Sequence, residues 1–140
     1  MTRQALDEML AQIRAEREQT LAALVDVTEE EFALPTGMQR WTDVRRVLLR
    51  FGDHMREHAN QVEGAREAVG CGPTMPQRML AEGEFAWGKL LASTVGLSDE
   101  DIDRQPPDGG WSVRQVLEHV LASERNYREA IKAARDARPG

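Results

Sequence analysis

The sequence has a single cysteine, few aromatic residues and no long run of apolar residues. Because Cys71 stands alone, an internal disulfide framework is excluded, and a reducing compartment is favoured. No apolar run approaches the roughly 20 residues that a membrane-spanning helix needs, and the charged N-terminus lacks the pattern of a signal peptide. We therefore expect a soluble, cytoplasmic protein without a membrane partner.

Basic residues are outnumbered by acidic ones, 18 against 24, which gives the 140-residue chain a net charge of -6. This balance argues against nucleic acid as a partner. Hydrophobic residues make up 41% of the chain and aromatic residues only 5%, and this composition favours helices over a β-sandwich. The length predicts a single domain over residues 1–140.

A weak internal repeat relates approximately residues 1–70 to residues 71–140. Trp41-Thr42 corresponds to Trp111-Ser112, and the acidic stretch 28–32 corresponds to 98–102. Each half predicts a helix, a capped turn, a tryptophan and a second helix. The two tryptophans are expected to staple their turns onto the helix that follows.

Apolar residues recur at helical spacing in four segments, the first over about 2–25 and the second over about 42–69, with Thr42 as its N-cap. Capping boxes are predicted at Thr28-x-x-Glu31, Thr74-x-x-Gln77 and Ser112-x-x-Gln115, and the last two begin the third and fourth helices. Four helices that each carry one apolar stripe bury those stripes most simply together. The predicted fold class is all-α, a four-helix bundle of two pseudo-symmetric helix–turn–helix halves.

All three histidines lie near apolar stripes. His54 and His58 are four residues apart, so on a helix they share one face and their imidazoles can converge on one metal ion. His119 lies beside the inward face of another helix and is a candidate third ligand. The alternative is that His54 and His58 are two partly solvated imidazoles at a chance spacing.

Two sequence motifs resemble those of a known family. Residues 110–120, which include Trp111, Ser112 and His119, resemble the Trp-Ser-Val-Arg-Glu-x-Leu-x-His-Leu signature of the DinB-like four-helix-bundle superfamily. His54-x-x-x-His58-x-x-Gln61 resembles that family's second signature. The resemblance implies one divalent ion, nickel, zinc or iron, held by His54, His58 and His119. In the family's usual order the Trp-Ser helix comes first, whereas here it comes last.

The resemblance also implies an activity. DinB-like proteins include transferases that use low-molecular-weight thiols and proteins that look like metal-dependent hydrolases. We therefore expect a metal-dependent thiol S-transferase or hydrolase that acts on small molecules, with a low-molecular-weight thiol as a further cofactor in the first case. The alternative is a non-catalytic metal-binding or protein-interaction bundle. Either function is compatible with a homodimer.

The catalytic base is less well indicated than the metal ligands. Glu16 and Glu82 interrupt apolar stripes, so they are candidates, although a structural role is favoured for each. Glu57 and Glu118 adjoin predicted ligands and are expected on solvated helix faces. Residues within one or two helical turns of the ligands that are expected to line a pocket are Gln61, Ser123 and Asn126.

Overall fold

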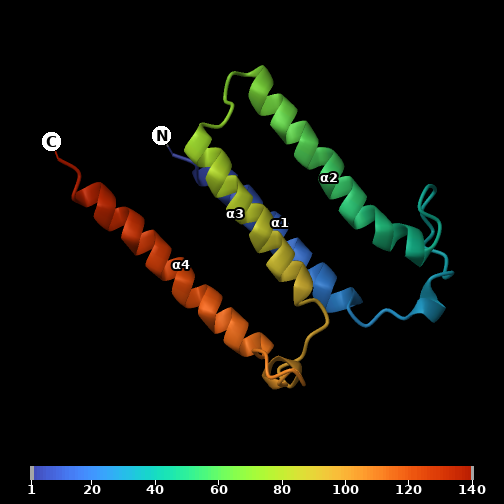
Figure 1. Cartoon of the computed structure of the whole chain (residues 1–140). Helices are drawn as coiled ribbons and strands as arrows, with labels where there is room; N and C mark the ends of the chain where they lie inside the picture. The colour runs from blue at the N-terminus through green and yellow to red at the C-terminus, as the bar shows by residue number, and fades with distance from the viewer. Residues whose placement is uncertain (1, 140) are drawn as a thin grey trace. The chain divides into compact units, whose positions relative to one another are not determined.

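The computed structural model describes residues 2–139, and these residues form helices, turns and loops without a strand. Figure 1 shows the four helices in chain order. Their bounds are α1 (Gln4–Leu24), α2 (Val44–Ala68), α3 (Met75–Ser93) and α4 (Val113–Asp136), with short 3-10 turns η1 (Glu29–Glu31) and η2 (Asp101–Asp103). The all-α class with four helices is therefore confirmed. Within the described residues, no helix is both long and apolar enough to cross a membrane.

Local capping explains where three of the helical elements begin. The Thr74 hydroxyl accepts from the backbone N–H of Gln77, and the Gln77 side chain accepts from the backbone N–H of Thr74. Ser112 and Gln115 make the same reciprocal pair at the start of α4. The Glu31 carboxylate likewise accepts from the Thr28 backbone N–H at η1. All three predicted capping boxes are confirmed.

The predicted N-cap of α2 is wrong by one residue. Asp43, not Thr42, caps the helix, and its carboxylate accepts from the backbone N–H of Arg46 at 2.9 Å. Thr42 belongs instead to the loop, where its carbonyl accepts from the Thr36 N–H at 3.1 Å. Pro35 and Asp43 also form an isolated antiparallel bridge, which keeps this stretch extended until Asp43. Loop pairing therefore delays the helix beyond the residue that the repeat indicates.

The second half of the chain repeats the turn of the first with a shift. Ser98 is the counterpart of Thr28, and its backbone N–H donates to Asp101 at 2.9 Å, as in a capping box. The 3-10 turn nevertheless forms at Asp101–Asp103. In this position the Asp103 carboxylate pairs with Arg114 at 2.5 Å and 3.1 Å, which joins η2 to the first turn of α4.

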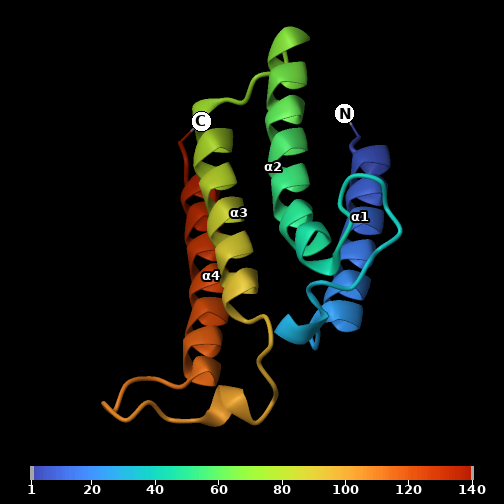
Figure 2. The ribbon, with the colours of Figure 1, turned by 90° about the vertical axis from the view of Figure 1, so that its right-hand side faces the viewer.

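The chain divides into two compact units, one that ends at Val95 and one that begins at Gly96. The first unit holds α1, η1, α2 and α3, and the second holds η2 and α4. Figure 2 shows the long connection from α1 through η1 to α2 and the loop from η2 to α4. The unit boundary does not coincide with the repeat boundary near residue 70, and a single domain over 1–140 stays a prediction.

Neither unit buries its apolar stripes within its own fold. Leu6, Met9 and Ile13 on α1 are 45–56% exposed, and no hydrophobic residue among 2–139 is buried. The one fully buried residue in this range is Ser112, at 3% exposure, which is the N-cap of α4. Local capping and helix formation are thus present in each unit, whereas the predicted apolar stripes are exposed.

Candidate functional site

Helix α2 brings two of the predicted ligands together. His54 and His58 are both exposed and lie one turn apart on the same face. Their ring centroids are 4.4 Å apart, with the rings at 76° in an edge-to-face arrangement. The helix backbone alone produces this proximity, because residues four apart are neighbours on a helix surface. This part of the spacing argument is borne out by the geometry.

Gln61 orients the second of these histidines. The His58 Nδ1 atom lies 2.6 Å from the Gln61 side-chain oxygen, one turn further along α2. With Nδ1 as the donor to this oxygen, the lone pair of His58 lies on Nε2. A hydrogen bond of this kind is the usual support of a metal-ligating histidine. Gln61 is thus in contact with a predicted ligand, and its role in lining a pocket stays a prediction.

Helix α4 presents His119 beside a tryptophan. The rings of Trp111 and His119 have centroids 5.2 Å apart and meet edge to face at 63°. Ser112, the buried N-cap, lies between them in sequence and bends the chain so that the tryptophan folds back along the helix. The Trp-Ser…His motif thus has a local structural basis, in which the cap positions the indole against the imidazole.

His119 belongs to a different unit from His54 and His58. Neither unit by itself, over residues 2–139, gathers three His, Cys, Asp or Glu side chains in a group that can hold an ion. The predicted third ligand, His119, lies on α4 in the second unit. The donor chemistry fits, because neutral imidazoles suit nickel, zinc and iron. That the three histidines share one ion stays a prediction.

A second side-chain cluster lies near the start of α2. The Arg50 guanidinium lies over the Trp41 ring at 4.9 Å from its centroid, and it donates to the Glu57 carboxylate at 3.0 Å. This hydrogen bond, together with the positive charge of Arg50, lowers the pKa of Glu57 below its usual range. Glu57 therefore stays ionised near neutral pH and is a poor proton acceptor, although it adjoins His58.

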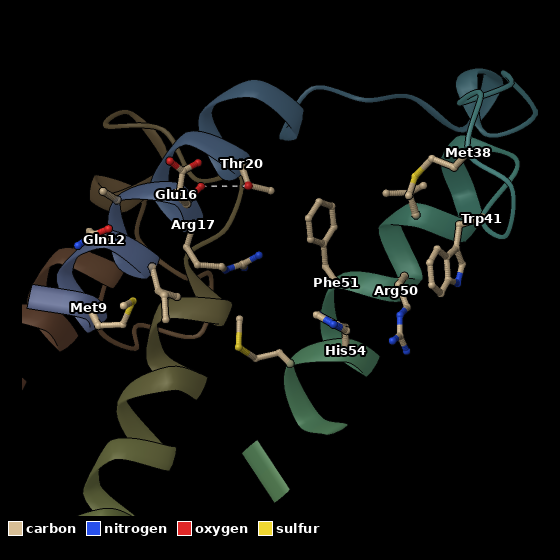
Figure 3. A pocket seen from close by; sticks show the side chains of 14 residues that line it. Met9, Gln12, Glu16, Arg17, Thr20, Met38, Trp41, Arg50, Phe51 and His54 are labelled. Atoms are coloured by element: carbon tan, nitrogen blue, oxygen red, sulfur yellow. Dashed lines mark hydrogen bonds between the residues drawn. The ribbon is translucent and has the colours of Figure 1, made fainter. Parts of the chain in front are cut away.

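A cavity of about 720 Å³ lies within the first unit, and His54 is part of its wall (Figure 3). One wall comes from α1 and the other from α2 and the loop before it. Most of the lining side chains are apolar. The lining residues are Met9, Gln12, Ile13, Ala15, Glu16, Arg17, Thr20, Met38, Trp41, Val47, Arg50, Phe51, His54 and Met55.

Sequence reasoning named Glu16 but missed its neighbour Arg17. Both line the cavity, and Figure 3 shows the Arg17 side chain extending toward Phe51 while the Glu16 carboxylate is directed away from it. The sequence does contain a signal for Arg17. It lies four residues after Ile13 and therefore on the apolar stripe itself, where a charged residue is unexpected.

The remaining candidates lie away from this cavity. Glu82 is exposed on α3 and is not part of the cavity wall. Ser123 is half-buried and Asn126 is exposed, both on α4 in the second unit. Their roles, and that of Glu82 as a base, stay predictions.

Comparison with known proteins adds one finding. Residues 82–140 match the family model described as the DinB superfamily. Searches of curated proteins and of solved structures gave no match. The matched segment contains all of α4, with Trp111, Ser112 and His119, whereas His54 and His58 lie before it. The C-terminal part of the chain, residues 82–140, is therefore similar to the DinB superfamily.

Proposed function

We propose that the protein is a metal-dependent enzyme that acts on small molecules, and that His54, His58 and His119 hold one nickel, zinc or iron ion. The observation that carries the proposal is the pair of adjacent imidazoles on α2, with the Nδ1 atom of His58 at 2.6 Å from the Gln61 side-chain oxygen. The family match supports His119, because it covers the helix that carries this residue. When bound, the ion supplies a Lewis acid that lowers the pKa of a water or thiol.

Two reactions fit this chemistry. In the first, the sulfur of a low-molecular-weight thiol forms a bond to an electrophilic carbon, and the leaving group departs with the thiol proton. In the second, water adds across an ester or amide and the bond is cleaved. The chain contributes the same groups to either reaction: apolar side chains on the cavity walls, and His54 on the wall of a cavity large enough for a small molecule.

Glu16 is the carboxylate that we retain as the candidate base. Glu16 is part of the cavity wall that also holds His54, with its carboxylate directed away from Phe51 and His54 (Figure 3), whereas Glu82 is not part of that wall. Glu57 is a weaker candidate, because Arg50 holds its pKa low and occupies its carboxylate. A base must accept a proton near the working pH, which a carboxylate already committed to a guanidinium does poorly.

The second candidate function is a non-catalytic metal-binding or protein-interaction bundle. It is favoured by the apolar stripes that neither unit buries in its own fold. Such stripes mark surfaces that pack against something else. A homodimer is one arrangement that supplies this surface. Light scattering of the purified protein measures the assembly directly.

Metal analysis tests the proposed site. After loading with nickel, zinc or iron and removal of free ion, wild-type protein is expected to retain one ion per chain. His58→Ala removes a ligand and is expected to lower the affinity by more than about tenfold. Glu63→Ala, an exposed change on the same helix, is the matched control and leaves the affinity unchanged. Equal metal binding by wild type and His58→Ala would contradict the site.

Turnover separates the enzyme from the binding bundle. The loaded protein is assayed with a panel of thiols against electrophilic substrates and with a panel of esters and amides. Activity that is lost on chelation and restored by the metal supports the enzyme. Activity that survives chelation contradicts the metal mechanism. Metal binding with no turnover on either panel supports the second candidate.

A further inference from the structure

An arginine without a carboxylate partner lies on the wall of the cavity in the first unit. Arg17 is half-buried on α1, and among residues 2–139 it forms no ion pair. Its guanidinium extends toward Phe51 and His54 on the opposite wall (Figure 3). A half-buried cation beside apolar side chains loses hydration, so an anion that pairs with it there is favoured more strongly than on an open surface.

The other charged groups on the wall do not neutralise Arg17. Arg50 is also cationic, and its guanidinium is already shared between Glu57 and the Trp41 ring. The Glu16 carboxylate is directed away from Phe51 and His54 in the view of Figure 3. The cavity therefore combines apolar walls with one guanidinium that forms no ion pair among residues 2–139, although the chain as a whole carries a net charge of -6.

We propose that this cavity binds a small carboxylic acid, with its carboxylate on Arg17 and its apolar body against Ile13, Phe51 and Met55. The volume of about 720 Å³ suits a ligand of this kind. A planar guanidinium matches a carboxylate with two parallel hydrogen bonds. If this acid is the substrate, that role rests on the proposed function, because it relies on His54 as a neighbouring metal ligand. Binding of the acid to the cavity does not rest on the proposed function.

Binding is tested with three probes that share one apolar body, in the presence of a chelator. They are 4-phenylbutyrate, 4-phenylbutan-1-ol and 4-phenylbutylamine, and their dissociation constants come from NMR titration of the backbone amides of α1 and α2. Wild-type protein is expected to bind the carboxylate about tenfold more tightly than the alcohol, since a charge-assisted pair is worth about that factor. The amine is expected to bind most weakly.

Variants of two arginines on the same helix make the test specific. Arg17→Gln is expected to remove the preference for the carboxylate, and Arg17→Lys to retain part of it. Arg14→Gln is the matched control, because Arg14 is exposed on α1 and is not part of the cavity wall. It is expected to keep the full preference. Circular dichroism confirms that each variant is as helical as wild type before titration.

The outcomes separate this proposal from the proposed function. Equal affinity for the carboxylate and the alcohol, or a preference that persists in Arg17→Gln, overturns the carboxylate site. Absence of binding by all three probes also overturns the carboxylate site. This result is expected where the chain's own side chains fill the cavity. A carboxylate preference in a protein that retains no metal supports the cavity and contradicts only the metal site.

Discussion

A tryptophan precedes both α2 and α4, but the side chain that contacts the tryptophan differs between the two helices. At the start of α2, Trp41 lies under the Arg50 guanidinium, and at the start of α4, Trp111 meets the His119 ring. The sequence repeat pairs His119 with Leu49, not with Arg50. The N-caps resolve this discrepancy. Arg50 and His119 each lie seven residues after their cap, because Asp43 caps α2 one residue later than the repeat indicates.

This comparison shows that the cap, not the repeat, sets which side chain meets the tryptophan. Seven residues are close to two helical turns, so the partner lies on the same face as the cap. In the first half that position holds a cation, which binds Glu57 and borders the cavity. In the second half it holds an imidazole with no carboxylate partner among the described residues. Because the cap of α2 lies one residue later than the repeat indicates, the tryptophan meets an arginine in the first half and a histidine in the second.

The largest expected effect comes from His119. Replacing it with alanine removes one of three proposed ligands, and we expect metal affinity to fall more than about 100-fold. Leu49→Ala, its counterpart in the repeat, is expected to leave metal affinity unchanged, although it is equally distant from a tryptophan in sequence. Competition titration with a chelating dye measures both. If Leu49→Ala lowers metal affinity as much as His119→Ala does, the effect is not specific to His119, and this histidine is not the third ligand.

The two tryptophans provide the next test. Trp111→Leu removes the ring that orients His119, and we expect metal affinity to fall about tenfold while the helix remains folded. Trp41→Leu removes the ring under Arg50 and is expected to leave metal affinity within about twofold of wild type. Trp111→Phe keeps an aromatic edge and is expected to recover most of the affinity. If both leucine variants behave alike, the two tryptophans do not have separate roles.

The N-caps are expected to differ in stability. Ser112→Ala removes a buried reciprocal cap and is expected to lower the free energy of unfolding by about 1–2 kcal/mol, and Asp43→Ala by about 1 kcal/mol. Thr42→Ala is expected to change it by less than about 0.5 kcal/mol, because the Thr42 side chain caps nothing. Urea unfolding followed by circular dichroism measures all three. A larger loss of unfolding free energy in Thr42→Ala than in Asp43→Ala would show that Thr42 is the N-cap of α2, as the repeat predicts.

The smallest expected effect is a pH dependence specific to the second unit. The hydrogen bond from Arg114, together with its charge, lowers the pKa of Asp103 below its usual value of 3.8. The unfolded chain therefore binds a proton at higher pH than the folded chain, so this pair stabilises the fold above about pH 4 and its contribution disappears as pH falls further. Asp103→Asn is expected to remove that part of the pH dependence.

Thermal unfolding between about pH 6 and pH 3 checks this prediction. The difference in midpoint between wild type and Asp103→Asn is expected to shrink as pH falls. Glu124→Gln, an exposed change on α4 without an ion pair among the described residues, is the control and is expected to keep the wild-type profile. A constant difference across the range would show that the Asp103–Arg114 pair does not contribute to the stability of the fold.

Much of the local structure was predictable because its causes are local. The reciprocal caps at Thr74 and Ser112 require only residues three apart, and the proximity of His54 and His58 requires only a helix. Asp43 was not predictable in this way. Its position depends on loop pairing with residues eight positions earlier, which no spacing rule within the helix contains.

The candidate site was predictable only in part. The histidine pair follows from spacing, and its hydrogen bond to Gln61 follows from the next turn of the same helix. Arg17 was missed because its importance depends on Phe51 and His54 across the cavity, far away in sequence. Glu16 was named from the same stripe, although its carboxylate is directed away from Phe51.

By itself, the sequence determined the four helices, the starting caps of α3 and α4, the capping box at η1 and the shared face of His54 and His58, because these depend on contacts within one or two helical turns. Only the tertiary structure decided that Arg50 meets Trp41 and that side chains of α1 and α2 line one open cavity with Arg17 on its wall. Such contacts depend on how a loop directs one helix past another, and side-chain periodicity carries no information about that direction.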